Sequence, residues 1–166
     1  MKSQTFNALN CSVARALEQV GEWWTLLIIR EAFFGVQRFS EFEQRLGISR
    51  NILNDRLGKL VEFGILERQH VVGRGNPQDY KLTRKGLDLF PVIVGLLQWG
   101  DRWVNKEQGA PVLLLERESG VEVAPVQVVS SIGIPLRPSG VDIKPGPGAD
   151  AAILARAVEM NAQKPD

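Results

Sequence analysis

Residues 38–68, RFSEFEQRLGISRNILNDRLGKLVEFGILER, predict two short helices joined by a tight turn. Ser40 and Glu43 have the spacing of a capping box at the start of the first helix. Gly47 is expected to end that helix, because glycine adopts the left-handed conformation that closes a helix without steric strain. Ser49 is then expected to cap the second helix. Two short helices joined by a glycine turn form a helix-turn-helix unit.

The second helix, Ser49 to Phe63, is expected to have one apolar and one polar face, with Gly64 closing it. The apolar face at helical spacing consists of Ile52, Leu53, Leu57, Leu60 and Val61. The polar face consists of Asn51, Asn54, Asp55, Gly58 and Glu62, with Ser49 and Arg50 at its N-terminal end. The N-terminal residues of such a helix contact base edges in the major groove, where Asn matches adenine and Arg matches guanine. This pattern predicts a DNA-reading helix, and an ordinary solvated helix face is the alternative.

Residues 65–82 predict a β-hairpin after this helix. Ile65 to Val72 and Gln78 to Leu82 are strand-like, and the Gly- and Pro-containing residues between them form a turn. A wing beside a reading helix is expected to lie along the phosphate backbone, where Arg74 at its tip would make a positioning contact. The alternative for Arg74 is an exposed loop cation.

Thr83 is predicted to cap a helix that is buried on two sides. Its apolar residues cover more of the helix circumference than one packed side requires: Leu87, Phe90, Pro91, Ile93, Val94, Leu96, Leu97, Trp99 and Trp103. Pro91 is expected to kink this helix near its middle. The helix Thr25 to Phe34 is also apolar, and the tryptophans at 23, 24, 99 and 103 are expected to join the two helices. A homodimer would explain burial on two sides, and a thick monomer core is the alternative.

Positive charge is concentrated in the same part of the chain. Residues 38–85 contain ten Lys and Arg and six Asp and Glu, so this segment has a net charge of +4, whereas the whole chain has a net charge of +1. A local positive field is expected at a nucleic-acid surface. The residues expected to contact double-stranded DNA are Arg38, Ser40, Ser49, Arg50, Asn51, Asn54, Asp55, Lys59, Arg74 and Asn76.

Several motifs follow one another in a fixed order between residues 9 and 105. They are Cys11-Ser12-Val13, Leu26-Leu27-Ile28-Ile29, Leu46-Gly47-Ile48-Ser49, Gly64-Ile65-Leu66-Glu67-Arg68, Tyr80-Lys81-Leu82-Thr83 and Trp99-Gly100. This ordered set resembles the HxlR-type winged-helix regulators, relatives of the MarR group. The resemblance implies a homodimeric bacterial transcription factor, most often a repressor, with its recognition helix at Ser49 to Phe63 and its wing at Val71 to Gln78. It also implies a dimer interface built from the N-terminal and long C-terminal helices.

Cys11 is the only cysteine, so the chain has neither an intramolecular disulfide nor a cysteine metal cluster. Because the sequence contains no signal peptide and no transmembrane run, a cytoplasmic protein that does not bind membranes is expected. Cys11 begins a predicted helix, where backbone dipoles favour the thiolate. Some HxlR relatives sense oxidants through a cysteine at a matching place, so the resemblance implies that Cys11 is a redox sensor. The alternative is a small residue packed near the dimer interface.

The composition changes from Gly109 onward. Six prolines interrupt short Val-rich runs that indicate small strands, and Ala151 to Met160 indicates a short helix. The predicted fold is therefore α+β, with a winged helix-turn-helix domain at residues 1–108. A β-rich C-terminal lobe with a short terminal helix is predicted at residues 109–166.

Catalysis, a cofactor and a metal site are not expected. The single histidine, His70, has no second His or Cys to form a metal cluster and no nucleophile set beside it. One class of function is a homodimeric, sequence-specific DNA-binding regulator. The other is a winged-helix module that binds a protein or a small ligand. An effector pocket is expected among Trp23, Trp24, Trp99 and Trp103, with plain core packing as the alternative.

Overall fold

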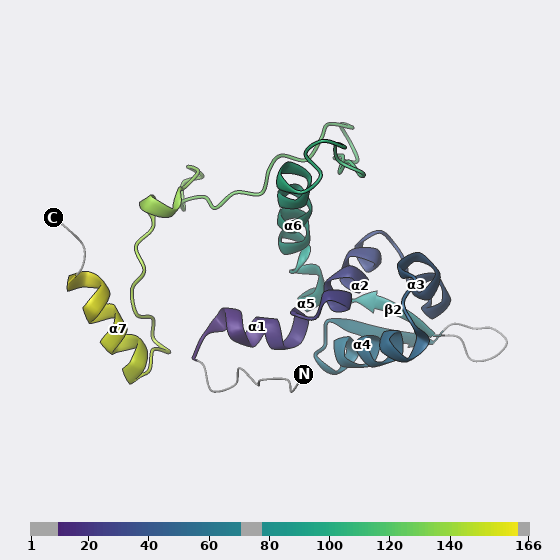
Figure 1. Ribbon diagram of the computed structural model, residues 1–166, viewed down its shortest axis with the longest axis horizontal. Coiled ribbons are helices and arrows are strands. Elements are labelled where there is room, and N and C mark those ends of the chain that lie inside the picture. Colours follow the sequence, from purple (N-terminus) through teal and green to yellow (C-terminus); the bar gives the residue numbers. More distant parts are fainter. Residues whose placement is uncertain (1–9, 71–77, 163–166) are drawn as a thin grey trace. The chain divides into compact units, whose positions relative to one another are not determined.

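The computed structural model describes residues 10–70 and 78–162 (Figure 1). The chain divides into two compact units. We call Gln19–Val126 the winged-helix unit, and Met1–Glu18 together with Gln127–Asp166 the arm unit. The predicted domain boundary at residues 108 and 109 differs from this division, because residues 109–126 belong to the winged-helix unit.

The winged-helix unit has helices and a hairpin in the predicted order (Figure 1). Its elements are α2 (Trp23–Phe33), α3 (Phe39–Leu46), α4 (Arg50–Glu62), β1 (Leu66–His70), β2 (Gln78–Leu82), α5 (Arg84–Leu87) and α6 (Phe90–Trp103). Helix α1 (Ser12–Val20) begins in the arm unit and ends in the winged-helix unit. This arrangement confirms the predicted α+β class and the winged helix-turn-helix.

The turn between α3 and α4 has the predicted geometry. Gly47 ends α3 in the left-handed conformation, with φ of 61°. Ile48 is buried beneath the turn. The Ser49 hydroxyl accepts a hydrogen bond from the amide of Ile52 at 3.4 Å and so caps α4. The predicted limits of this second helix are therefore confirmed.

The start of α3 corrects the predicted capping box of Ser40 and Glu43. The helix begins at Phe39, so Ser40 lies inside the first turn. The N-cap is Arg38, whose amide donates a hydrogen bond to Glu41 Oε2 at 3.4 Å. Arg38 is held in an extended conformation by a β-bridge to Asp79, and the helix therefore begins directly after it.

An apolar core lies where α2, α3, α4 and the hairpin meet. The largest fully buried side chains are Ile28, Ile29, Phe42, Leu53, Leu57, Leu60, Ile65 and Leu66. The three leucines of α4 belong to this core, and burying each contributes about 1.5–3 kcal/mol. Their burial fixes one face of α4 inward and leaves the opposite face outward.

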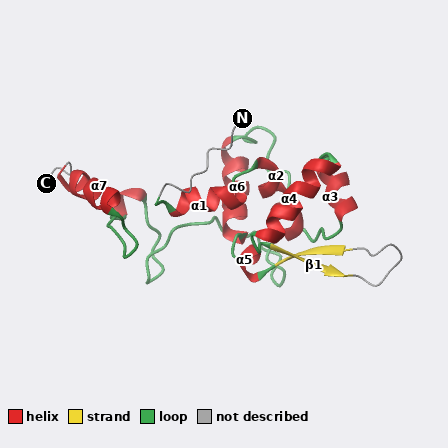
Figure 2. Cartoon of the chain, turned by 90° about the horizontal axis from the view of Figure 1, so that it is seen from below, coloured by secondary structure: helices red, strands yellow, loops and turns green. Residues whose placement is uncertain are grey.

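The hairpin pairs β1 and β2 antiparallel, with Leu66 opposite Leu82 and Arg68 opposite Tyr80. Figure 2 shows the two strands side by side, extending from the helices as a wing. On the other edge of β2, the amide of Tyr80 donates to the carbonyl of Gln37 at 2.8 Å. Residues 37–38 thus add a short third segment to the wing base, which is too short to show a strand pattern in the sequence.

The residues after Thr83 form two helices, which corrects the prediction of one kinked helix. The Thr83 hydroxyl accepts from the amide of Gly86 at 3.1 Å, as expected for its cap. Helix α5 then ends at Leu87, and α6 starts at Phe90. Pro91 lies in the first turn of α6, where its missing N–H has no helical acceptor to lose. The proline therefore begins a helix and does not kink one.

The described residues after α6 differ from the predicted β-rich lobe. Across 104–162 they contain two isolated β-bridges, Leu115 with Glu122 and Val129 with Pro135, and no strand. A 3-10 turn, η2 (Pro138–Gly140), and helix α7 (Ala151–Ala162) follow. The frequent prolines remove backbone donors, which limits the length of any ladder.

Gly86 provides a test of how tightly the fold packs. A Cβ atom at this position would overlap the carbonyl oxygen of Ile65 and stand 2.9 Å from Leu82 Cδ2. We expect Gly86→Ala to lower the free energy of unfolding by about 1–3 kcal/mol, because backbone atoms cannot move aside easily. Urea unfolding at a fixed protein concentration measures this change.

Gly58→Ala is the matched control, since a Cβ at Gly58 in α4 would meet no heavy atom within 4 Å. There the same substitution should raise stability by about 0.5–1 kcal/mol, because alanine has the higher helix propensity. Equal effects at the two glycines would contradict the close packing of α5 on Ile65 and on Leu82 of β2.

Candidate nucleic-acid interface

Helix α4 presents a continuous polar surface on the side opposite its buried leucines. Its exposed polar residues are Ser49, Arg50, Asn51, Asn54, Asp55, Lys59 and Glu62. The cap residue Ser49 and the five α4 residues expected to contact DNA are all among them. Gly58, which was predicted on the polar face, is half-buried. The helix therefore offers amide, hydroxyl, guanidinium and ammonium groups along one accessible side.

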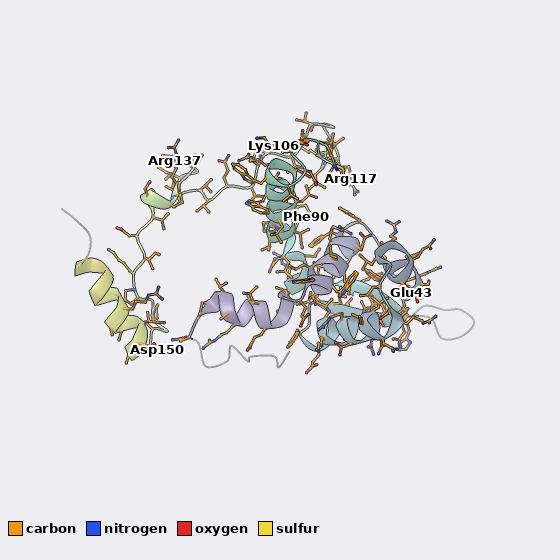
Figure 3. All side chains as sticks on the ribbon, in the orientation of Figure 1. Glu43, Phe90, Lys106, Arg117, Arg137 and Asp150 are labelled. Carbon is orange, nitrogen blue, oxygen red and sulfur yellow. The ribbon has the colours of Figure 1, made fainter. Side chains whose placement is uncertain are left out.

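Arg50 is held at the N-terminal end of this surface by two neighbours on α3. Its Nη1 lies 3.8 Å from Glu43 Oε2, and its guanidinium carbon lies 5.5 Å from the centre of the Phe39 ring. Figure 3 labels Glu43 on α3. The Arg50 side chain is nevertheless 74% exposed. Such contacts restrict the rotamers of the guanidinium while leaving it accessible to a ligand.

Asp55 carries one of the two negative charges on the exposed side of α4, the other being Glu62, and two cations lie close to the Asp55 carboxylate. Its Oδ2 lies 3.3 Å from Lys59 Nζ and 3.5 Å from Arg56 Nη1. Arg56 also reaches Glu22 at 3.2 Å, just before α2. Because both partners of Asp55 are cationic, its carboxylate is offset locally. Arg56 in turn ties α4 to the start of α2.

Ile52 corrects the predicted apolar stripe, because its side chain is 41% exposed. One residue corresponds to about 100° around a helix, so Ile52 lies well to one side of Leu53. It shares the accessible side of α4 with Lys59 and Asp55. An angular calculation on the sequence would have found this apolar contact on the polar face.

The remaining predicted contacts lie near the wing and α3. Arg38 and Ser40 are exposed, and Arg38 Nε lies 4.0 Å from Asp79 Oδ1 at the wing base. Arg74 and Asn76 lie outside the described residues. The structure thus places Arg38 at the junction of the wing and α3.

A buried carboxylate anchors α3 against α2. Glu31 is 6% exposed, and its Oε1 accepts from Arg30 at 2.6 Å. Its other oxygen lies 3.7 Å from Arg45 on α3. Sequence reasoning did not identify Glu31, because a single acidic residue in an apolar helix carries no periodic signal. These ion pairs hold α3, the helix that precedes α4, against α2.

The structure does not bring the four tryptophans together. Trp23 is 86% exposed, Trp99 is 59% exposed and Trp103 is 64% exposed, whereas Trp24 packs against the core. A cavity of about 290 Å³ does lie in the winged-helix unit, but none of these tryptophans lines it. Its lining includes Leu26, Leu27, Arg30 and Phe34 from α2 and its end, and Ile93, Leu96, Leu97 and Asp101 from α6.

Cys11 lies immediately before α1, at the helix start that the sequence predicts, and its free thiol is exposed. Its carbonyl accepts the first helical hydrogen bond, from Arg15 at 3.0 Å. Within residues 10–70 and 78–162, no three His, Cys, Asp or Glu side chains gather in a possible metal site. None of the helices in these ranges has the length and apolar character required to cross a membrane.

Comparison with known proteins identifies relatives that match most of the chain and relatives that match little more than half of it. The HxlR-like helix-turn-helix model matches residues 19–108. The HTH-type transcriptional regulator Rv3095 of Mycobacterium tuberculosis is 43% identical over 144 residues, covering 87% of this chain and 91% of that protein. The crystal structure of the candidate transcription factor PA1607 superposes with a TM-score of 0.78 at 39% identity, covering 84% of this chain and 97% of that one.

A shorter solved relative matches only part of the chain. The oxidized form of the redox regulator HypR is 27% identical, with a TM-score of 0.52, and covers 55% of this chain and 96% of its own. The match to Rv3095 over 144 of the 166 residues therefore extends beyond residues 19–108, which the family model matches. On its sequence, its fold and these matches, the chain belongs to the HxlR-like helix-turn-helix family of transcriptional regulators.

Proposed function

We propose that this regulator is a homodimer that binds specific double-stranded DNA and represses transcription. Each copy places α4 in a major groove and its wing along the phosphate backbone. A dimer bound to a promoter blocks other proteins from binding the same stretch of duplex. We therefore expect the regulator to repress transcription.

The observation that carries the proposal is the division of α4 into two faces. Leu53, Leu57 and Leu60 are completely buried, so the rotation of the helix about its axis is fixed. The polar residues that remain outward are types that match base edges in the major groove. A fixed helix with readable side chains meets the geometric requirement for sequence recognition.

Asn51 and Asn54 are the proposed readers of adenine, and Arg50 of guanine, each by a pair of hydrogen bonds. Each good pair contributes about 1–3 kcal/mol of discrimination. The Arg50 guanidinium is oriented before DNA binds, because Glu43 and Phe39 already restrict the side chain. The exposed Ile52 is suited to an apolar contact with a thymine methyl group.

Phosphate contacts are proposed for Ser49 at the N-terminus of α4 and for Lys59 farther along it. Arg38 and Ser40 would contact phosphates at the start of α3, and Arg74 and Asn76 on the wing. These contacts position the protein without reading sequence. They also make binding salt-dependent, because each neutralised phosphate releases counterions.

The dimer is supported by an unpartnered apolar stripe on α6. Val92, Leu96, Trp99 and Trp103 follow spacings of four, three and four residues, and each is 48–64% exposed. This spacing repeats a single face along a helix, as in paired-helix seams. A second α6 packed on this stripe would cover it and relate the two α4 helices by a two-fold axis.

Two observations support regulation of the proposed binding. The exposed thiol of Cys11 is accessible to an oxidant, and the related HypR is described as a redox regulator. The cavity between α2 and α6 favours a small, mostly apolar effector, with Arg30 and Asp101 as its polar groups. An effector in the cavity would act on DNA binding through α2, which packs against α4.

The double substitution Asn51→Ala/Asn54→Ala tests the proposed readout. The DNA upstream of the gene is the probe, with fluorescence anisotropy as the readout. We expect the preference for this DNA over random duplex to fall by at least about tenfold, because two adenine contacts are lost. Arg74→Ala should weaken binding to both duplexes alike and make the salt dependence less steep.

Arg117→Ala is the control, because Arg117 is an exposed cation in a loop beyond α6 (Figure 3). It should leave both affinities unchanged. Wild-type protein that binds no duplex at low salt would contradict the proposal and favour a protein- or ligand-binding module.

Trp99→Glu tests the dimer seam. A buried charge at this position should raise the dimer dissociation constant by about tenfold or more, because an apolar contact is replaced by a desolvated carboxylate. Light scattering after size exclusion distinguishes the 18.4 kDa monomer from a dimer of twice that mass.

Arg102→Glu introduces the same side chain on the same exposed helix outside the stripe, and it should leave the dimer intact. If the two variants raise the dimer dissociation constant equally, or if neither raises it, α6 does not form the dimer interface.

A further inference from the structure

We propose that Lys85 is a positioning residue for DNA recognition. Lys85 lies in α5, directly after the wing. Its ammonium holds the end of α4, and the joint between α4 and the wing, in the orientation that specific DNA requires. This inference rests on the proposed DNA binding, and it concerns a residue outside the expected DNA contacts.

The chain turns sharply where α4 ends and β1 begins. Gly64 is in the left-handed conformation, with φ of 66°, which commonly ends a helix. Its amide donates to the carbonyl of Val61 at 3.0 Å, and the amide of Ile65 donates to the carbonyl of Leu60 at 2.9 Å. The carbonyl groups of residues 63–65 follow the last helical turn, so no amide of α4 can donate to them.

Two residues of the segment after the wing supply the missing donors. The Thr83 hydroxyl donates to the carbonyl of Gly64 at 2.6 Å, and the Thr83 amide donates to the carbonyl of Ile65 at 3.1 Å. Lys85 Nζ donates to the carbonyl of Phe63 at 2.7 Å. The turn after α4 is therefore attached at each of its carbonyl groups to the start of α5.

Lys85 makes a second hydrogen bond that anchors its ammonium. Nζ donates to Oε1 of Gln19, in the last turn of α1, at 2.7 Å. The next residue, Val20, is buried in the core of the winged-helix unit, so the anchor is attached to a fixed point. Charge-assisted hydrogen bonds of this length hold the ammonium in a defined position. A cation there also interacts favourably with the C-terminal end of the α4 dipole.

The contact acts on a different part of α4 from the core. The buried leucines fix the rotation of the helix, whereas Lys85 is exposed and bonds to its C-cap residue, Phe63. Strand β1 begins at Leu66, so the position of the Phe63 carbonyl affects the angle between α4 and the wing. Both elements must contact one duplex at the same time. Fixing their angle in advance lowers the entropy cost of binding.

The test compares Lys85→Met with Arg84→Met in the full chain. Each variant loses one positive charge from α5, but Arg84 pairs with Asp88 at 3.4 Å, directly after that helix. We expect Lys85→Met to raise the dissociation constant for the DNA upstream of the gene about fivefold or more above that of Arg84→Met, because binding must then order the end of α4. Both variants should weaken binding to random duplex by the same small factor. Fluorescence anisotropy measures these affinities, and urea unfolding confirms that the variants are folded.

Gln19 separates positioning from charge. Gln19→Leu removes the anchor without changing the net charge, and it should lower the preference for upstream over random DNA by about threefold or more. The conservative variant Gln19→Glu retains an acceptor and should restore that preference. In the Lys85→Met protein, Gln19→Leu should have no further effect, because the contact is already lost.

The outcomes distinguish this inference from the proposed function. If the wild-type protein prefers the upstream DNA but Lys85→Met behaves like Arg84→Met, the positioning role is overturned and the proposed DNA binding stands. Additive effects of Gln19→Leu and Lys85→Met would also overturn that role. A wild-type protein with no preference between the two duplexes would overturn both.

Discussion

The fixed rotation of α4 is the constraint on which the rest of the structure depends. Three leucines on one side of this helix are fully buried against α2, α3 and the hairpin. Burial of about 1.5–3 kcal/mol per leucine opposes any rotation that would expose them. Each outward residue of α4 is therefore held in a defined direction. A helix that rotated freely would present a changing set of groups and read no sequence.

Charged contacts then refine what the fixed helix presents. Arg50 is guided by Glu43 and the Phe39 ring from α3, while Asp55 is offset by Lys59 and Arg56. The Arg50 and Lys59 side chains are 74% and 50% exposed, so their ion pairs contribute little to stability. Their effect is on orientation, because they limit the positions of long side chains before a ligand arrives. Apolar burial thus fixes the rotation of α4, and ion pairs restrict the positions of its outward side chains.

The sequence predicted the elements whose limits are set locally. Gly47 and Ser49 encode the turn and the cap of α4 in their own conformational preferences, and the structure confirms both. Features set by distant residues were missed. Arg38 caps α3 because it pairs with Asp79, forty-one residues away in the chain. No window of sequence around α3 contains that information.

The same reasoning explains the errors after the wing. Pro91 can kink a helix or begin one, and the choice depends on where the preceding helix ends. The tryptophans at 99 and 103 have the composition of a core, yet they are exposed in the single chain. Side chains that a second subunit would cover look the same in a sequence as side chains that the chain itself covers. The Val-rich runs beyond α6 raise the same ambiguity.

The account depends most on two α4 helices being held together at the spacing of one DNA turn. Spin labels at position 54 in a Cys11→Ser/Asn54→Cys chain would report the distance between the two copies by double electron–electron resonance. The account predicts a main distance near the roughly 34–36 Å that separates successive major-groove turns. A main distance below about 20 Å, or no dipolar coupling because the chains are monomeric, would contradict it.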